Sequence, residues 1–255
     1  MAHDSRLVLT VIQKFQYILG IKFFTGDMEG LLELCAGHFI VVPSAPTLIE
    51  LPTDPADREA FEKSDFAITD SAFMVLLWKV LTGQSLPRIS GLKLLRGLLA
   101  SGELKKAGAS FWIMPSAAEM KTNLAWLNHN GYPVTGDDCF VAPFYPKGPL
   151  TDPQLLRFIE AKKPRYLIIN IGGGVQERLG YYLKNHLSYR PGILCVGAAI
   201  AFITGLQANI PHWADAFGLG WFFRCLQAPG KFVPRYWRAL RLVPLLARYR
   251  ERSVG

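Results

Sequence analysis

The sequence predicts an α/β fold with a Rossmann-like parallel sheet flanked by helices. Short runs rich in β-branched and aromatic residues alternate with runs whose apolar residues recur at helical spacing. The connections between these runs are short, and such repeated strand–helix units are typical of a parallel sheet covered on both faces. Half of the 255 residues are hydrophobic, which is enough to bury a sizeable core.

The expected elements follow this pattern in chain order. Strands are expected at 38–43, 65–69, 109–114, 139–144, 165–171 and 193–196. Helices are expected at 27–37, 55–63, 72–82, 91–106, 116–129, 151–162 and 175–187, and several of them begin at good capping residues. The uncharged stretch 192–206 is short for a membrane span and is interrupted by glycine, so a buried strand followed by a buried helix is expected there.

The C-terminal segment carries most of the positive charge. Residues 231–255 hold seven Lys and Arg against one Glu, a net +6 of the total +8, which leaves +2 for residues 1–230. The arginines are mixed with Phe, Tyr, Trp and Leu, which is typical of a segment at a membrane interface. We therefore divide the chain into an α/β domain, 1–230, and a basic membrane-associating appendage, 231–255.

This tail has two alternative interpretations. Nucleic acid is a rival acidic partner, but no recognised motif supports it, so no nucleic-acid binding is expected. A basic helix that packs on the domain with its charges in water is the ordinary structural alternative. The amino-terminal residues lack the pattern of a secretory signal peptide, so a cytoplasmic location is expected.

A glycine turn follows one of the expected strands. In IINIGGGVQERL, strand 165–171 runs into Gly172–Gly174 and then into a helix, so backbone N–H groups can approach an anion closely. Gln176 could bond a sugar or phosphate oxygen, whereas Glu177 also suits an ordinary first helical turn. A dinucleotide fingerprint is excluded because Glu177 stands where its third glycine is required, and a tight corner without a ligand fits equally well.

Two further segments hold candidate site residues, one at the end of an expected strand and one after the helix that follows it. Asp70 ends strand 65–69 and could act as a general base, although a helix N-cap, a role also open to Ser71, is the more ordinary interpretation. Arg88 and Ser90 precede the next helix, where an arginine can clamp a phosphate or simply lie at the surface.

Several classes of site are disfavoured because their motifs are missing. The sequence has no DxD pair, no GxSxG and no Cys or His spacing for a metal, so neither a metal nor a cofactor is expected. The four cysteines are far apart, and free thiols in a reducing compartment are expected for Cys35, Cys139, Cys195 and Cys225.

Three segments in this order carry a resemblance to a known family. ITDSAFMVLLWKVLTGQSLPRISGLKLL is similar to an Asp-Gly strand end, a helix and an Arg-Val-Thr-Gly loop, and IINIGGGVQERLGYYL to a Gly-Ala-Pro-Lys-Gln-Glu turn and helix. The segment from GILCVGAAI to PRYWR resembles a glycine-rich strand end, Ala-Pro-x-Trp, Leu-Gly-x-x-Trp-x-x-Arg and a basic tail. Over residues 16 to 240 the chain resembles the bacterial WecG/TagA/CpsF glycosyltransferases.

The resemblance implies an inverting glycosyltransferase of cell-surface polysaccharide synthesis, peripheral on the inner face of the plasma membrane. Its donor would be a UDP-sugar and its acceptor a polyprenyl-diphosphate-linked sugar. Asp70 matches the general base, Gln176 lies beside the diphosphate, and Arg235 and Arg238 match tail arginines that neutralise the leaving diphosphate. The expected substrate-binding residues are Ser44, Arg88, Ser90, Gly172, Gly173, Gly174, Glu177, Gly197 and Arg224.

The chain departs from the family pattern at several polar positions. Val42 and Ser44 stand in place of a Thr-x-Asn motif, Lys93 in place of an Asp, and Ala201 in place of an Asp thought to hold the nucleoside. Each lost buried polar contact costs about 1–3 kcal/mol unless the site is rebuilt. The second hypothesis is therefore a catalytically silent relative that acts as a membrane-bound binding or scaffold protein. The sequence leaves the sugar, the acceptor and a homo-oligomeric state open.

Overall fold

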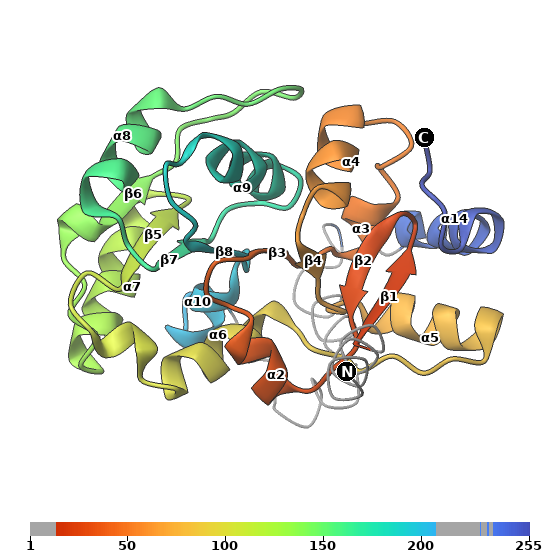
Figure 1. The fold of residues 1–255 in the computed structure, drawn as a ribbon, viewed down its shortest axis with the longest axis horizontal. Coiled ribbons are helices and arrows are strands. Elements are labelled where there is room, and N and C mark those ends of the chain that lie inside the picture. Colours follow the sequence, from red (N-terminus) through yellow and green to blue (C-terminus); the bar gives the residue numbers. More distant parts are fainter. Residues whose placement is uncertain (1–13, 208–229, 231–233, 235–236) are drawn as a thin grey trace, which may run out of the picture.

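The sheet is the frame of the molecule. The computed structural model describes residues 14–207, 230, 234 and 237–255. Its strands are β1 (Phe15–Ile18), β2 (Ile21–Phe24), β3 (Phe39–Val41), β4 (Phe66–Ala67), β5 (Ser110–Met114), β6 (Cys139–Val141), β7 (Tyr166–Ile169) and β8 (Gly192–Cys195). They lie in the order β1-β2-β4-β3-β8-β7-β5-β6, and every neighbouring pair is parallel except β1 with β2 (Figure 1). The expected mostly parallel α/β sheet is confirmed.

The hairpin of β1 and β2 was not predicted from the sequence. The two residues that connect its strands are Leu19 and Gly20, with φ of 52° and 78°. Two-residue hairpin loops need this left-handed backbone and usually signal it with Asn-Gly or Asp-Gly. Leucine gives no such signal, and its N–H donates to the Arg250 carbonyl at 2.6 Å, a contact from the far end of the chain.

Helices cover both faces of the sheet. They are α2 (Met28–Glu33), α3 (Ala45–Leu48), α4 (Pro55–Glu62), α5 (Ala72–Thr82), α6 (Gly91–Ala100), α7 (Ala117–His129), α8 (Pro153–Lys162), α9 (Val175–His186), α10 (Ala199–Ile203) and α14 (Leu242–Tyr249), with short 3₁₀ turns η1 (Glu103–Lys105) and η2 (Gly136–Asp138). Helix α4 packs against α9 on one face, while α2 and α10 pack against α6 on the other (Figure 1).

The expected helix over 91–106 is interrupted. It ends at Ala100, and Gly102 adopts a φ of 77° before η1 begins. Glycine takes this left-handed conformation without steric cost, so it ends the helix where the apolar periodicity alone predicted continuation. The strand expected over 139–144 is likewise shorter and ends at Val141.

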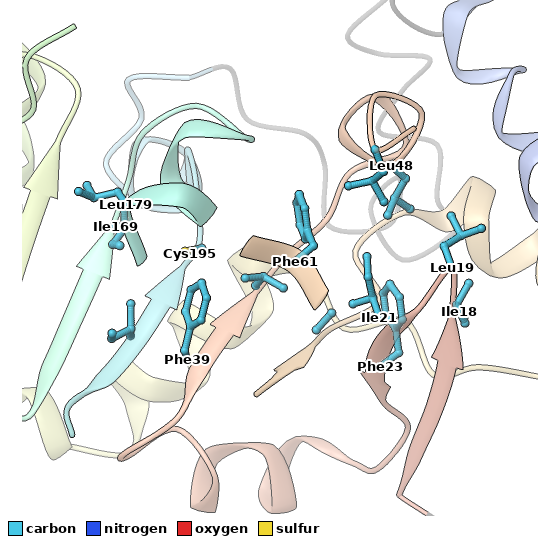
Figure 2. Close-up of a cluster of buried hydrophobic side chains, with 14 of the residues drawn as sticks. Ile18, Leu19, Ile21, Phe23, Phe39, Leu48, Phe61, Ile169, Leu179 and Cys195 are labelled. Atoms are coloured by element: carbon cyan, nitrogen blue, oxygen red, sulfur yellow. The ribbon is translucent and has the colours of Figure 1, made fainter. Parts of the chain in front are cut away.

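The core lies on both faces of the sheet. Phe39, Ile169 and Cys195 point from β3, β7 and β8 toward Phe61 of α4 and Leu179 of α9 (Figure 2). The alternate strand residues, including Ile40, Ile168 and Leu194, belong to a second cluster on the opposite face. Because both faces are buried, the central strands are apolar throughout, as parallel strands usually are.

The described C-terminal residues pack against the domain. Leu242 and Leu246 of α14 are fully buried in the cluster shown in Figure 2, together with Val254. Helix α14 packs against α5, whereas Arg241, Arg248 and Arg252 are exposed. Among all the residues that the structure describes, no helix is both long and apolar enough to span a membrane.

Candidate functional site

Four strand ends meet at one edge of the sheet. Residue pairs Val41–Ala67, Ile40–Leu194 and Ile169–Cys195 align the carboxyl ends of β4, β3, β8 and β7. The connection after β3 leads to α4 on one face, and the one after β8 leads to α10 on the other. Ligands of open α/β sheets bind where neighbouring connections separate in this way. The loops 42–44, 68–71, 170–174 and 196–198 therefore form the candidate site.

The glycine turn lies at the end of β7. Gly172 and Gly173 are exposed, and a Cβ at position 172 would meet no atom within 4 Å. A Cβ at position 173 would lie 2.8 Å from Cγ2 of Thr47, so the turn approaches the first residues of α3 closely. Gly174 has a φ of 86° and is the N-cap of α9. The open surface of the turn is thus Gly172, with Gly173 beside α3.

Glu177 occupies the start of α9. Its Oε2 accepts the Gly174 N–H at 2.6 Å, and its Oε1 accepts from Nε2 of Gln176 at 2.9 Å. The side chain is fully buried, and this burial raises the pKa of its carboxyl to about 7, with the charge of Asp57 acting in the same direction. An anion at this helix start would therefore meet a carboxyl group that is partly ionised at neutral pH.

Gln176 connects two of the loops. Its Oε1 accepts the Gly197 N–H at 2.9 Å, and its Nε2 donates to Glu177, so both atoms of the amide have partners. Gly197 itself has a φ of 58° directly after β8. The structure brings these three predicted site residues together, and it uses the Gln176 amide to hold the β8 loop against the glycine turn.

Asp70 is not the cap of the helix that follows it. The hydroxyl of Ser71 accepts the Met74 N–H at 3.2 Å and caps α5. Nε of Arg88 donates to the carbonyl oxygen of Asp70 at 3.2 Å, so the loop before α6 lies against the end of β4. The capping interpretation of Asp70 is therefore wrong, and the structure places Arg88 and Asp70 side by side.

The two candidate serines stand at helix starts. Ser44 is the N-cap of α3, and its N–H donates to the Thr47 hydroxyl at 2.9 Å. Ser90 is buried and its hydroxyl accepts the Lys93 N–H at 3.2 Å. Both are positioned at the predicted edge, and both have a local structural role that residue spacing did not distinguish from ligand binding.

Of the predicted arginines Arg224, Arg235 and Arg238, the structure describes only the last. Arg224 and Arg235 lie outside the described residues. Arg238 forms an ion pair with Glu50 at 2.6 Å, in which both side chains are exposed. Such exposed pairs contribute little to stability, so this contact does not fix Arg238 in place.

An ion pair between α4 and α9 was missed by sequence reasoning. Nε of Arg178 lies 2.8 Å from Oδ1 of Asp57, although the two atoms are poorly aligned for a hydrogen bond. The Arg178 side chain is 6 % exposed, and Nη1 also donates to the carbonyls of Pro146 and Gly148 at 2.8 and 2.5 Å. Asp57 resembles an ordinary first-turn acid and Arg178 an ordinary helical residue, so no local signal marked them.

No cluster of three or more His, Cys, Asp or Glu side chains suited to a metal occurs within the residues that the structure covers.

A family model described as Glycosyl transferase WecG/TagA/CpsF family matches residues 16–254. No curated protein matches the chain. The family match spans all four loops of the candidate site and also reaches α14.

Proposed function

Since this chain belongs to the WecG/TagA/CpsF glycosyltransferase family, we propose that it is an inverting hexosyltransferase of bacterial cell-envelope polysaccharide synthesis. It moves a sugar from a UDP-sugar to a polyprenyl-diphosphate-linked acceptor. The observation that supports this best is the meeting of Asp70, Arg88, Gly197 and the glycine turn at one edge of the sheet.

The geometry suits a single displacement at the anomeric carbon. Asp70 takes the proton of the acceptor hydroxyl, whose oxygen attacks the sugar as the bond to UDP breaks, and the configuration inverts. Strands β4 and β7 are three interstrand spacings apart, about 14 Å, so a sugar diphosphate has room between Asp70 and the glycine turn. The tail arginines Arg235 and Arg238 stabilise the charge on the leaving UDP, and Arg88 and Arg224 bind the substrate.

A transfer assay tests this function. The purified protein is incubated with a panel of UDP-sugars and a short polyprenyl-diphosphate-linked sugar, and labelled lipid product is extracted. If no donor is consumed and no nucleotide binds, the silent relative becomes the better account. Ala201, which is 1 % exposed, favours that alternative because it stands where the family has an Asp thought to hold the nucleoside.

We also propose that the end of the molecule formed by α5 and α14 rests on the inner face of the plasma membrane. Leu76 and Val80 of α5 are 58 % and 72 % exposed, and Trp237 before α14 is 74 % exposed. Exposed arginines 241 and 248 accompany them, and each basic residue near an anionic surface contributes about 1 kcal/mol. Apolar side chains with basic neighbours are the chemistry that an anionic lipid surface recognises.

Substitutions of exposed residues test this membrane surface better than truncation does, because removing α14 would open the core at Leu242 and Leu246. The variant Trp237→Ser/Arg241→Ser/Arg248→Ser is expected to stay in the supernatant with vesicles containing phosphatidylglycerol, whereas the wild type sediments. High salt is expected to release the wild type as well. Lys105→Ser/Lys121→Ser, which removes two exposed cations elsewhere, is the control and should sediment normally. Equal sedimentation of both variants contradicts the proposal.

A further inference from the structure

Gly174 is in contact with two carboxyl groups. Glu177 accepts its N–H at 2.6 Å. A Cβ at position 174 would lie 2.6 Å from Oδ2 of Asp57, so the carboxylate of Asp57 lies directly against the glycine. Only a residue without a side chain fits here, and the two acidic side chains lie at the helix start where the diphosphate of the proposed donor would also lie.

Arg178 is in direct contact with one of these two residues, Asp57. Its side chain is almost fully buried and forms the ion pair with Asp57. Its Nη1 donates hydrogen bonds to the carbonyls of Pro146 and Gly148. Burial raises the pKa of Asp57, as does the charge of Asp54, and Arg178 acts against both. One guanidinium therefore neutralises a carboxylate beside the glycine turn and ties α4, α9 and the loop 146–148 together.

We propose that Arg178 is a positioning residue of the donor site: through Asp57 and the 146–148 loop it keeps the glycine turn fixed and low in negative charge, so that the turn receives a nucleoside diphosphate. This inference rests on the proposed function. We do not expect Arg178 to contact the nucleotide itself, because its side chain is only 6 % exposed, its Nε lies against Asp57, and its Nη1 donates to the carbonyls of Pro146 and Gly148.

We therefore expect substitutions at the two partners of this ion pair to have different effects on UDP affinity. Arg178→Gln leaves the Asp57 carboxylate uncompensated beside the turn and repels the diphosphate. Asp57→Asn keeps the shape of the side chain, removes that charge and leaves Arg178 bonded to the loop. A purely structural ion pair would instead give the same loss from either substitution.

Helix α9 supplies a matched control at its other end. Nζ of Lys184 forms an ion pair with Asp65 at 2.7 Å and also donates to the Lys63 carbonyl. Asp65 lies just before β4, at the amino edge of the sheet, away from the glycine turn. Lys184→Gln therefore removes a cation and an ion pair from the same helix without changing the charge at Gly174.

The experiment is calorimetric titration of UDP and of uridine into the full chain. Arg178→Gln is expected to weaken UDP binding about tenfold or more, and Asp57→Asn to leave it equal or tighter. The double variant Asp57→Asn/Arg178→Gln, which buries no unpaired charge, should recover UDP affinity to within about threefold. Uridine affinity should change less than UDP affinity in every variant, and Lys184→Gln should match the wild type.

A second readout needs no ligand. Amide hydrogen exchange at 172–174 and at Lys147 and Gly148 is expected to increase in Arg178→Gln and to stay unchanged in Lys184→Gln. If Asp57→Asn weakens UDP binding as much as Arg178→Gln, or exchange in these loops is unaffected, the inference is wrong. If the wild type binds no UDP while exchange still responds to Arg178, the proposed function fails and the positioning of the turn stands without it.

Discussion

Asp70→Asn is expected to lower the rate of sugar transfer by about 100-fold or more, because an amide cannot take the proton of the acceptor hydroxyl. UDP affinity should stay within about threefold of the wild type, since the carboxylate acts on the acceptor rather than on the nucleotide. The assay compares the maximal transfer rate and the UDP dissociation constant of the two proteins. Folding is not expected to suffer, because Ser71 rather than Asp70 caps α5.

Ser71→Ala is the matched control for this prediction. It removes the hydroxyl that accepts the Met74 N–H and is expected to cost about 1 kcal/mol of stability. Below its unfolding temperature it should transfer sugar at close to the wild-type rate. Full activity in Asp70→Asn, or an equal loss in Ser71→Ala, would show that the carboxylate of Asp70 is not the base.

Gly174→Ala is expected to lower the free energy of unfolding by about 3–5 kcal/mol. The φ of 86° is unfavourable for alanine, and the new Cβ would lie 2.6 Å from Oδ2 of Asp57. Asp57 cannot move away without breaking its contact with the buried Arg178, so both costs act together. Urea unfolding followed by circular dichroism measures the change.

Gly172→Ala is the control for Gly174→Ala: it makes the same substitution in the same turn, at a position where a side chain has room. A Cβ at 172 meets no atom within 4 Å and the φ is not left-handed, so a change within about 1 kcal/mol is expected. Similar unfolding midpoints for the two alanine variants would mean that the ion pair does not restrain the turn.

The sheet could be predicted because each of its central strands is marked by residues that are neighbours in the sequence. Each central strand is a short apolar run bounded by turn residues, and the strand-end loops follow from that pattern. The hairpin at Leu19 could not be predicted, because the contact that supports its turn comes from Arg250, far along the chain. The pair of Asp57 and Arg178 was missed for the same reason, since α4 and α9 meet only in the folded molecule.

The site was predicted in position but not in detail. The loops at Asp70 and Gly172 followed from the rule that ligands bind at the carboxyl ends of parallel strands. Which side chains face a ligand could not be read from spacing. Gln176 looked available for a sugar or phosphate, yet its partner is Gly197, which is 21 residues further along the chain and lies on another strand end.

Calorimetric titration with UDP, and then with GDP, CMP and NAD, shows whether this edge of the sheet binds a nucleotide-activated sugar. We expect micromolar binding of UDP, weaker binding of the other three nucleotides, and loss of UDP affinity when Arg178 is replaced by Gln. A folded sample that binds none of these nucleotides would instead favour a catalytically silent, membrane-associated relative.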